Sequence, residues 1–128
     1  YSIAYCHPKT IDRLNIYNAS RLAMRNAIKK LKPNFNIKSI VLVDGRGRIK
    51  GLNTEQMPIV KGDRKVFAIA CASIIAKVHR DKMMVRYAQK FPEYGFEKHK
   101  GYGTKYHRVR LASLGPCALH RQSFRLDY

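Results

Sequence analysis

The segment Ser39–Asp44 (SIVLVD) constrains the fold of this chain more than any other stretch. Its apolar residues follow one another without alternating with polar ones. Such a run is typical of a strand that is buried on both faces, as in parallel sheets covered by helices. The segment therefore predicts an internal strand of an α/β domain, which ends at the turn-forming pair Asp44-Gly45.

Helical patterns flank this strand, and together they predict one α/β domain over residues 1–128 with a sheet that is at least partly parallel. Proline and glycine mark the ends of the helices, at Pro33, Pro92 and Gly115-Pro116. The predicted elements are the end of a strand at Tyr1–Tyr5, a helix over Asp12–Lys32, the strand Ser39–Asp44, a strand at Met57–Val60, a helix from Arg64 to Tyr87, and a helix from the N-cap Thr104 to Leu114.

The charge of the chain points to a polyanionic partner. Twenty-six Lys and Arg residues against eight Asp and Glu give a net charge of +18, spread over the whole sequence. Such an excess attracts nucleic acid, although a merely basic surface remains the alternative. Charge alone does not separate a nuclease from a ribosomal protein. No apolar stretch is long enough to span a membrane, so no membrane partner is expected.

The three cysteines, Cys6, Cys71 and Cys117, form no Cys-x-x-C pair, and their number is odd. This usage is typical of small buried thiols in a reducing compartment rather than of disulfides or a zinc site. It predicts a cytoplasmic protein.

Two of the eight carboxylates lie where parallel strands end. Asp44 is the last residue of the predicted strand Ser39–Asp44, and Asp63 follows the predicted strand Met57–Val60 and precedes a helix. Ligands of open α/β sheets bind at the carboxyl ends of strands, and Mg²⁺ prefers carboxylate oxygens. Asp44-Gly45 could instead form a plain turn, and Asp63 a plain helix N-cap. Asp81, one helical turn after Lys77, is expected to form an ion pair with it.

Two glycine-rich basic segments could contact nucleic acid. Gly45–Asn53 (GRGRIKGLN) follows the first strand and contains Arg46. Gly95–Thr104 combines His99 and Lys100, as donors to phosphate, with the aromatic face of Tyr102. The alternative for the second segment is an ordinary surface loop in which Tyr102 packs on the core.

Several blocks of the sequence together resemble the bacterial type of ribonuclease HII, in the order and at the spacings of that family. They are Ile11–Ile16 with Ala19 and Leu22–Met24, Leu42–Gly45, Val60–Asp63, Ala72–Val78 with Arg80-Asp81, Tyr94–Phe96, His99–Thr104 with His107, and Gly115-Pro116 with His120-Arg121 and Ser123-Phe124.

The resemblance implies a ribonuclease H-like mixed sheet flanked by helices, with a helical C-terminal region. It implies an endonuclease that hydrolyses the RNA strand of RNA/DNA hybrids and cuts DNA 5′ to embedded ribonucleotides. Two divalent ions, Mg²⁺ or Mn²⁺, would activate the attacking water and stabilise the leaving 3′ oxygen. The family uses four carboxylates, and Asp44 and Asp63 match the third and fourth, as catalytic metal ligands.

The first two family carboxylates form an Asp-Glu pair within an Asp-Glu-Ala-Gly-Arg-Gly motif, and no Asp-Glu pair occurs in this sequence. The motif and its strand are expected upstream of Tyr1. The fold is therefore expected to be incomplete, with its first strands missing, and an upstream segment or a partner chain would complete the sheet. The complete protein is expected to be a monomer.

The resemblance also assigns binding residues. Tyr102 matches a tyrosine that stacks on the deoxyribose after the ribonucleotide, and Lys100, His99, Lys61 and Arg46 are expected to contact the nucleic acid. Gly45-Arg46-Gly47 repeats the letters of the family's Gly-Arg-Gly but follows a different aspartate, so that role is not transferred to it. With two of four carboxylates, the 128 residues alone are expected to be inactive. The alternative is a non-catalytic, basic nucleic-acid-binding fragment or remnant.

Overall fold

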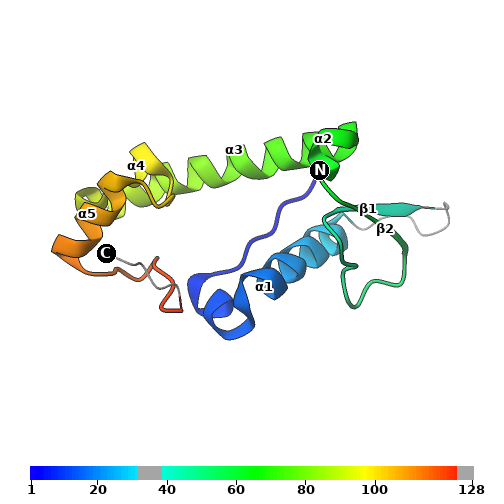
Figure 1. Cartoon of the computed structure of the whole chain (residues 1–128), viewed down its shortest axis with the longest axis horizontal. Helices are drawn as coiled ribbons and strands as arrows, with labels where there is room; N and C mark the ends of the chain where they lie inside the picture. Colours follow the sequence, from blue (N-terminus) through cyan, green and yellow to red (C-terminus); the bar gives the residue numbers. More distant parts are fainter. Residues whose placement is uncertain (32–38, 124–128) are drawn as a thin grey trace. The chain divides into compact units, whose positions relative to one another are not determined.

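A computed structural model of the chain describes residues 1–31 and 39–123. The chain divides into two compact units, Tyr1–Ser73 and Ile74–Tyr128. Helices and a small sheet make up the first unit and helices alone the second, which confirms the α/β class. The elements in chain order are α1 (Pro8–Lys30), β1 (Ile40–Asp44), β2 (Glu55–Ile59), α2 (Gly62–Lys65), α3 (Phe67–Lys90), the 3-10 helix η1 (Pro92–Tyr94), α4 (Phe96–His99) and α5 (Lys105–Leu114) (Figure 1).

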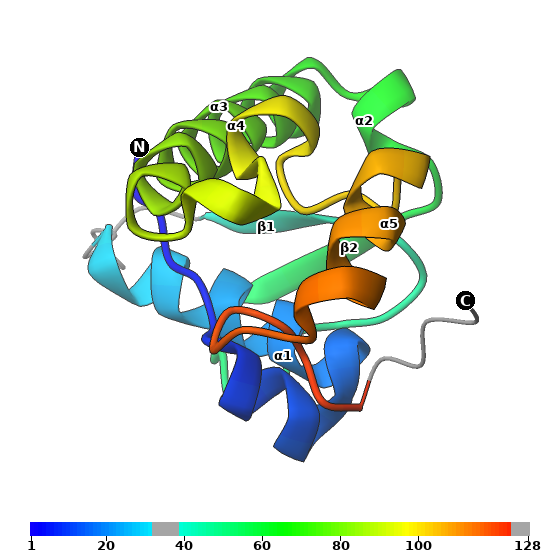
Figure 2. The ribbon, with the colours of Figure 1, turned by 90° about the vertical axis from the view of Figure 1, so that its left-hand side faces the viewer.

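The predicted strands Ser39–Asp44 and Met57–Val60 exist, as β1 and β2, and are parallel. β1 pairs with β2 in a register that sets Ile40 opposite Glu55 and Asp44 opposite Ile59, and Figure 2 shows the strands side by side. Pro58 has no N–H to donate, which suits a strand with a neighbour on one side. The parallel pairing brings the carboxyl ends of β1 and β2, and hence Asp44, to one edge of the sheet.

The prediction that the strand Ser39–Asp44 is buried on both faces is wrong for this chain. Only Val43 is buried, at 2% exposure, whereas Ile40 is 43% exposed and Val41 and Leu42 are half-buried. Burial on both faces requires further strands and covering helices, and among the described residues the sheet contains β1 and β2 alone. The exposed Ile40 agrees with a sheet that lacks some of its strands.

The predicted strand end at Tyr1–Tyr5 is also wrong, because residues 1–7 form no strand. This segment instead lies along α1, where Lys30 Nζ donates to the Ile3 carbonyl oxygen over 3.2 Å and Cys6 Sγ to that of Ala19 over 3.3 Å. A β-prone segment forms a strand only beside another strand with free backbone groups, and it has none here.

Helix α1 begins at Pro8, four residues before the predicted start at Asp12, with the proline at its first turn. Asn15 interrupts it with φ 63° and ψ 166°, and its side-chain oxygen accepts a hydrogen bond of 3.0 Å from the Asn18 N–H. Asn15 therefore caps the second half of the helix. The predicted end at Lys32 and its stop at Pro33 lie outside the described residues.

The single helix predicted from Arg64 to Tyr87 is two helices. Val66 adopts an extended conformation, with φ −129° and ψ 117°, between the short α2 and the long α3. The predicted stop at Pro92 is confirmed, since α3 ends at Lys90. On α3, Lys77 and Asp81 form the predicted ion pair, with 2.7 Å between Nζ and Oδ2.

The second unit is built around an aromatic and aliphatic core. Its buried members are Met84 and Ala88 of α3, Tyr94, Phe96 and Leu111. The predicted loop Gly95–Thr104 contains the helical turn α4, and α5 has the predicted bounds. Thr104 Oγ1 accepts a hydrogen bond of 3.2 Å from the His107 N–H, which confirms Thr104 as N-cap.

Candidate metal and nucleic-acid site

Asp44 lies at the last position of β1, and its carboxylate reaches the segment that follows β2. Asp44 Oδ1 accepts a hydrogen bond of 2.8 Å from the backbone N–H of Gly62. Gly45 N–H continues the ladder by donating to the Ile59 carbonyl oxygen over 2.9 Å. Asp44 is exposed and is bonded across the strand ends, so it does more than open a turn.

The close approach at Gly62 depends on glycine. A Cβ at this position would lie 2.7 Å from Ile69 Cδ1, so that side chain would have to shift, and 3.3 Å from Asp44 Oδ1, which is a tight contact. The preceding Lys61 has a left-handed backbone, with φ 55°, which turns the chain from the strand end into α2. Gly62 is buried, while Lys61 and Asp63 on either side of it are exposed.

Asp63 directly follows Gly62 and lies in the first turn of α2. The N-cap of α2 is Lys61, and no side chain caps this helix, so the reading of Asp63 as a plain N-cap is wrong. One backbone hydrogen bond thus joins the Asp44 carboxylate to the residue beside Asp63. The structure places these two predicted residues in the same small region, although they are 19 positions apart in the sequence.

Neither carboxylate forms an ion pair with a lysine or arginine among the described residues, although the chain carries 26 of these cations. The exposed carboxylates, one at the end of β1 and one in the first turn of α2, are of the type that a hard divalent cation prefers, and Mg²⁺ sites complete such ligands with water and phosphate. In the described ranges, no group of three or more His, Cys, Asp or Glu side chains could hold a metal. The structure therefore brings together two carboxylates here, fewer than such a group requires.

The basic segment after Asp44 is held in a defined conformation. Ile49 is buried at 3% exposure, and its backbone N–H and carbonyl oxygen both bond to the Gln56 side-chain amide, over 2.7 and 3.0 Å. Arg21 of α1 donates to the Gly47 carbonyl oxygen and stacks on Tyr17, with 4.9 Å from its guanidinium carbon to the ring centre. Arg46 is exposed on this anchored segment.

Tyr102 lies on the surface of the second unit, which contradicts the alternative in which it packs on the core. Its side chain is 54% exposed, and the Arg80 guanidinium lies 5.9 Å from its ring centre. Arg80 also donates to the Lys100 carbonyl oxygen over 3.2 Å. Lys100 has a left-handed backbone, with φ 51°, and its Nζ donates to the Glu97 carbonyl oxygen.

His99 does not share this surface. Its side chain is 5% exposed, its Nε2 donates to the Tyr94 carbonyl oxygen over 2.9 Å, and its Nδ1 accepts from the Gly101 N–H over 3.1 Å. Both ring nitrogens are therefore used within the chain. The structure brings Lys100 and Tyr102 together at the surface and places His99 beneath them.

Sequence reasoning missed a cluster of three histidines in the second unit. The His99 and His107 rings stack at 4.1 Å between centres, and 3.1 Å separates His107 Nε2 from His120 Nε2. Burial lowers the pKa of both His107 and His120, and the neighbouring imidazoles lower both further. Histidines 13 positions apart have no regular spacing in the sequence, so no sequence signal could have revealed the cluster.

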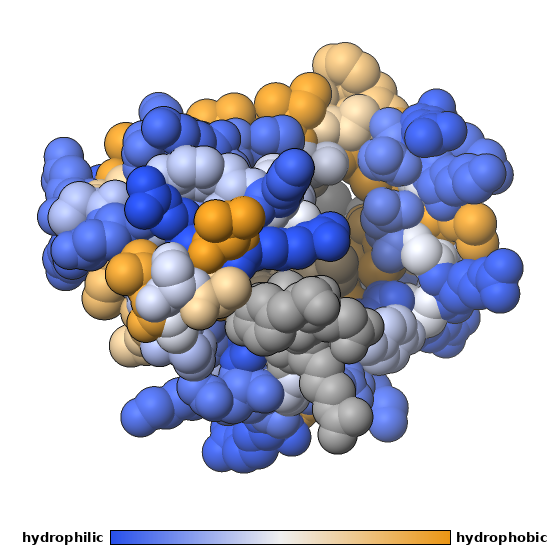
Figure 3. Space-filling model, turned by 60° about the vertical axis from the view of Figure 1, so that its left-hand side comes forward, coloured by the Kyte–Doolittle hydropathy of each residue, from blue (hydrophilic) through white to orange (hydrophobic). Residues whose placement is uncertain are grey.

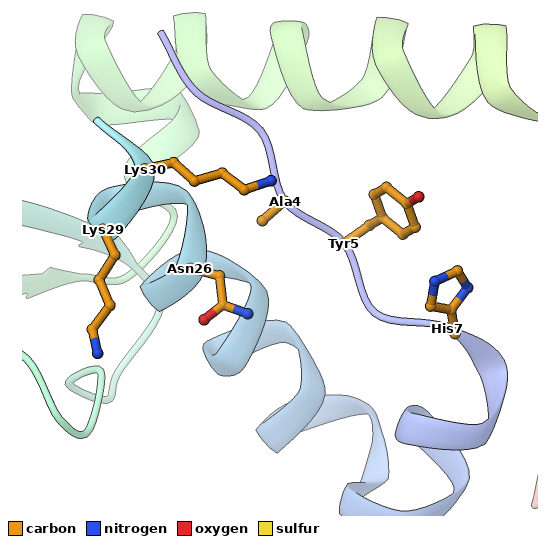
Figure 4. Close-up of a pocket in the computed structure, with 6 residues that line it drawn as sticks. All are labelled: Ala4, Tyr5, His7, Asn26, Lys29 and Lys30. Atoms are coloured by element: carbon orange, nitrogen blue, oxygen red, sulfur yellow. The ribbon is translucent and has the colours of Figure 1, made fainter. Parts of the chain in front are cut away.

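A separate groove of about 420 Å³ opens between the N-terminal segment and α1 (Figure 4). Its lining residues are Ala4, Tyr5, His7, Asn26, Lys29 and Lys30. It contains no carboxylate, so it does not extend the Asp44 and Asp63 region. Hydrophilic side chains also cover most of the face of the molecule drawn in Figure 3.

No helix in residues 1–31 or 39–123 is long and apolar enough to cross a membrane. The three cysteines are partly buried and form no disulfide in the described residues.

The sequence matches proteins of one family over almost all of its length. The model of the family Ribonuclease HII matches residues 1–127. The chain is 54% identical to the ribonuclease HII of Caldicellulosiruptor bescii and 45% identical to that of Pelodictyon phaeoclathratiforme, over 97% and 98% of its residues. These matches cover 58% and 60% of the two relatives, so the chain spans less than two thirds of the curated proteins it matches. The chain belongs to the ribonuclease HII family.

Proposed function

We propose that this chain is part of an endonuclease that hydrolyses the RNA strand of RNA/DNA hybrids and cuts DNA on the 5′ side of embedded ribonucleotides. The observation that carries the proposal is the hydrogen bond from the Gly62 N–H to the Asp44 carboxylate, which joins the two strand ends beside Asp63. Membership of the ribonuclease HII family supports the reaction class. We expect one domain once the sheet is completed.

Asp44 and Asp63 would hold divalent ions, Mg²⁺ or Mn²⁺, together with carboxylates that this chain lacks. Bound ions of this kind lower the pKa of water and stabilise charge on the oxygens of a phosphodiester. The contribution of the chain is to hold the Asp44 carboxylate by the Gly62 N–H, while Asp44 and Asp63 are both exposed residues. Neither carboxylate forms an ion pair with a lysine or arginine in the part of the chain that the structure describes, so both would be available to a metal.

The basic residues near each carboxylate would bind the phosphate backbone. Lys61 lies two residues before Asp63 and Arg46 two residues after Asp44, and both side chains are exposed. In the second unit, Lys100 would contact phosphate and the exposed ring of Tyr102 would stack on a sugar or base. We do not retain His99 as a direct contact, because both of its ring nitrogens bond within the chain.

We further propose that the 128 residues alone do not catalyse the reaction. The chain contains no adjacent Asp-Glu pair, and two carboxylates hold two dications weakly. The test is cleavage of a labelled DNA duplex with one embedded ribonucleotide, in Mg²⁺ and in Mn²⁺. The chain alone is compared with the chain joined to an upstream segment that carries an Asp-Glu pair.

Cleavage by the joined polypeptide, and its loss in the Asp63→Asn variant, is the expected result. Glu93→Gln is the matched control, because Glu93 is an exposed carboxylate of η1 in the second unit. Failure of the joined, folded polypeptide to cleave would contradict the nuclease proposal. Efficient cleavage by the 128 residues alone would contradict their inactivity.

A second candidate is a non-catalytic module that binds nucleic acid through charge. The net charge of +18 and the two-carboxylate limit favour it. This module would bind hybrids, DNA and RNA with equal affinity and a steep dependence on salt. A preference for a duplex with an RNA-to-DNA junction at constant ionic strength would exclude it.

A further inference from the structure

The three-histidine cluster of the second unit, His99, His107 and His120, is not used by the proposed chemistry and lies directly beneath Tyr102. Its hydrogen bonds fix which nitrogen of each ring carries the proton. His99 Nε2 faces the Tyr94 carbonyl oxygen and must donate, so its Nδ1 is free to accept from the Gly101 N–H. His107 Nδ1 lies 2.9 Å from the Tyr102 carbonyl oxygen and must also donate.

His120 completes the chain of hydrogen bonds. Its Nδ1 accepts from the Cys117 N–H over 3.0 Å, so its Nε2 carries the proton and donates to His107 Nε2. His107 then donates from Nδ1 to the Tyr102 carbonyl oxygen. One directed chain of bonds therefore runs from Cys117 through two neutral imidazoles to the backbone of Tyr102.

The same cluster holds the backbone on both sides of Tyr102. Tyr102 N–H donates to the His99 carbonyl oxygen over 2.8 Å, and the Gly101 N–H donates to the His99 ring. His99 and His107 stack on each other, and Phe96 contacts both rings edge to face, at 5.7 and 6.0 Å between centres. The tyrosine ring is exposed, while the backbone that carries it is bonded to buried groups.

We propose that His107 and His120 are positioning residues for Tyr102, and that they hold it in place only while both rings are neutral. This inference rests on the proposed role of Tyr102 as a contact to nucleic acid. It adds that this contact to nucleic acid weakens in acid. The net positive charge of the chain alone would predict the opposite, because protonation of histidines adds positive charge and should tighten the binding of nucleic acid.

The hydrogen bonds explain why acid should weaken the contact made by Tyr102. A first proton on the His107–His120 pair leaves His120 Nδ1 carrying a hydrogen, whichever ring holds the charge, so the Cys117 N–H loses its acceptor. A second proton sets two N–H groups against each other across 3.1 Å and breaks the bridge, so His107 keeps its Nδ1–H toward the Tyr102 carbonyl oxygen but loses the hydrogen bond that fixes the position of its ring. The other groups around the rings are Tyr94 of η1, Tyr106 of α5 and Cys117, and the contacts described for the three imidazoles include no carboxylate that would stabilise a charge. Burial accordingly lowers the pKa of both rings.

The test compares two amide substitutions at His107 in the full chain. In His107→Asn, the side-chain amide replaces Nδ1, so it still donates to the Tyr102 carbonyl oxygen but does not titrate. In His107→Gln, the amide replaces Nε2, and the bond to Tyr102 is lost. His7→Asn is the control for an exposed histidine outside the cluster. The readouts are hydrogen exchange of the Tyr102 and Thr104 amides, and the Kd for a fluorescent RNA/DNA hybrid at pH 7.5 and 5.5 at fixed ionic strength.

At pH 7.5 we expect His107→Asn to bind like the unsubstituted chain and His107→Gln to bind about two- to tenfold more weakly, the range set by one lost hydrogen bond. Acidification should weaken binding by the unsubstituted chain and by His7→Asn, and should weaken binding by His107→Asn less. Exchange at Thr104, whose N–H bonds the same carbonyl oxygen of Tyr102, should quicken in His107→Gln alone.

The outcomes separate the two proposals. Equal exchange rates in His107→Asn and His107→Gln, or tighter binding of all variants in acid, would overturn the positioning role. If instead exchange changes as expected while Tyr102→Ala binds the hybrid normally, the cluster holds the loop but the proposed function of Tyr102 fails.

Discussion

The carboxylate region of the first unit and the Tyr102 loop of the second are held in place by different interactions. Asp44 is exposed and is positioned by the backbone N–H of Gly62, where an added methyl group would force the Ile69 side chain to shift. Tyr102 is positioned through its own backbone by buried imidazoles that have lowered pKa values. In our proposals, the first arrangement leaves negative charge for a cation, and the second requires that both imidazoles be uncharged.

This difference matters because each region fails for a different reason. The first is sensitive to the loss of a charge or to the addition of one methyl group. The second is sensitive to the loss of the hydrogen bond from His107 to the Tyr102 carbonyl oxygen, or to the protonation of the imidazoles. Four measurements test this contrast, beginning with the largest expected effect.

The largest effect is expected from Asp44→Asn in the polypeptide completed with an Asp-Glu segment. Asparagine keeps an oxygen that can accept from the Gly62 N–H, so the fold should be unchanged while one ligand charge is lost. A unit charge near a cation contributes roughly 4 kcal/mol at an intermediate dielectric, so Mn²⁺ affinity should fall by about a hundred- to a thousandfold. Isothermal titration with Mn²⁺ measures it, and unchanged affinity would remove Asp44 from the metal site.

Gly62→Ala should destabilise the first unit by about 1–3 kcal/mol, as overpacking does. The new methyl group would lie 2.7 Å from Ile69 Cδ1. Urea unfolding measures the change, and Gly103→Ala is the control, because a Cβ there meets nothing within 4 Å. The double variant Gly62→Ala with Ile69→Val should recover part of the loss. No recovery would show that the clash with Ile69 is not the cause.

Thr104→Ala should lower the free energy of unfolding by about 1 kcal/mol, because α5 loses its N-cap. Thr104→Ser keeps the hydroxyl oxygen that accepts from the His107 N–H and should keep most of the stability. A similar loss in both variants would assign the effect to the threonine methyl group instead.

The smallest effect is expected from pH alone. The pKa values of His107 and His120 in the folded state lie below the unfolded value near 6.5. Between these folded pKa values and pH 6.5, the folded state therefore binds fewer protons than the unfolded state. Stability of the second unit should therefore be full above pH 6.5 and fall as the pH drops through the folded pKa values. Unfolding curves from pH 7.5 to 5.0 measure this, and the dependence should shrink in His107→Asn.

The elements that sequence predicted correctly are those that local patterns specify. The strand ending at Asp44, its parallel partner before Asp63 and the stop of α3 before Pro92 follow from apolar runs and from residues that break helices. The Thr104 cap follows from side-chain chemistry at a helix start. The carboxylates of Asp44 and Asp63 could be placed together because parallel strands bring their carboxyl ends to the same edge.

The remaining features depend on contacts between distant residues. Whether β1 is buried on both faces, and whether Tyr1–Tyr5 pairs as a strand, depend on which strands lie beside them, and a residue pattern does not specify its neighbours. His99 is of a residue type that binds phosphate, but its side chain is directed inward. His107 and His120 come together because both rings pack against Phe96. Sequence alone determined the class of fold and the family, and it singled out the two carboxylates that we propose as metal ligands. The tertiary structure decided which basic and aromatic side chains face solvent, because burial depends on the whole set of packed neighbours.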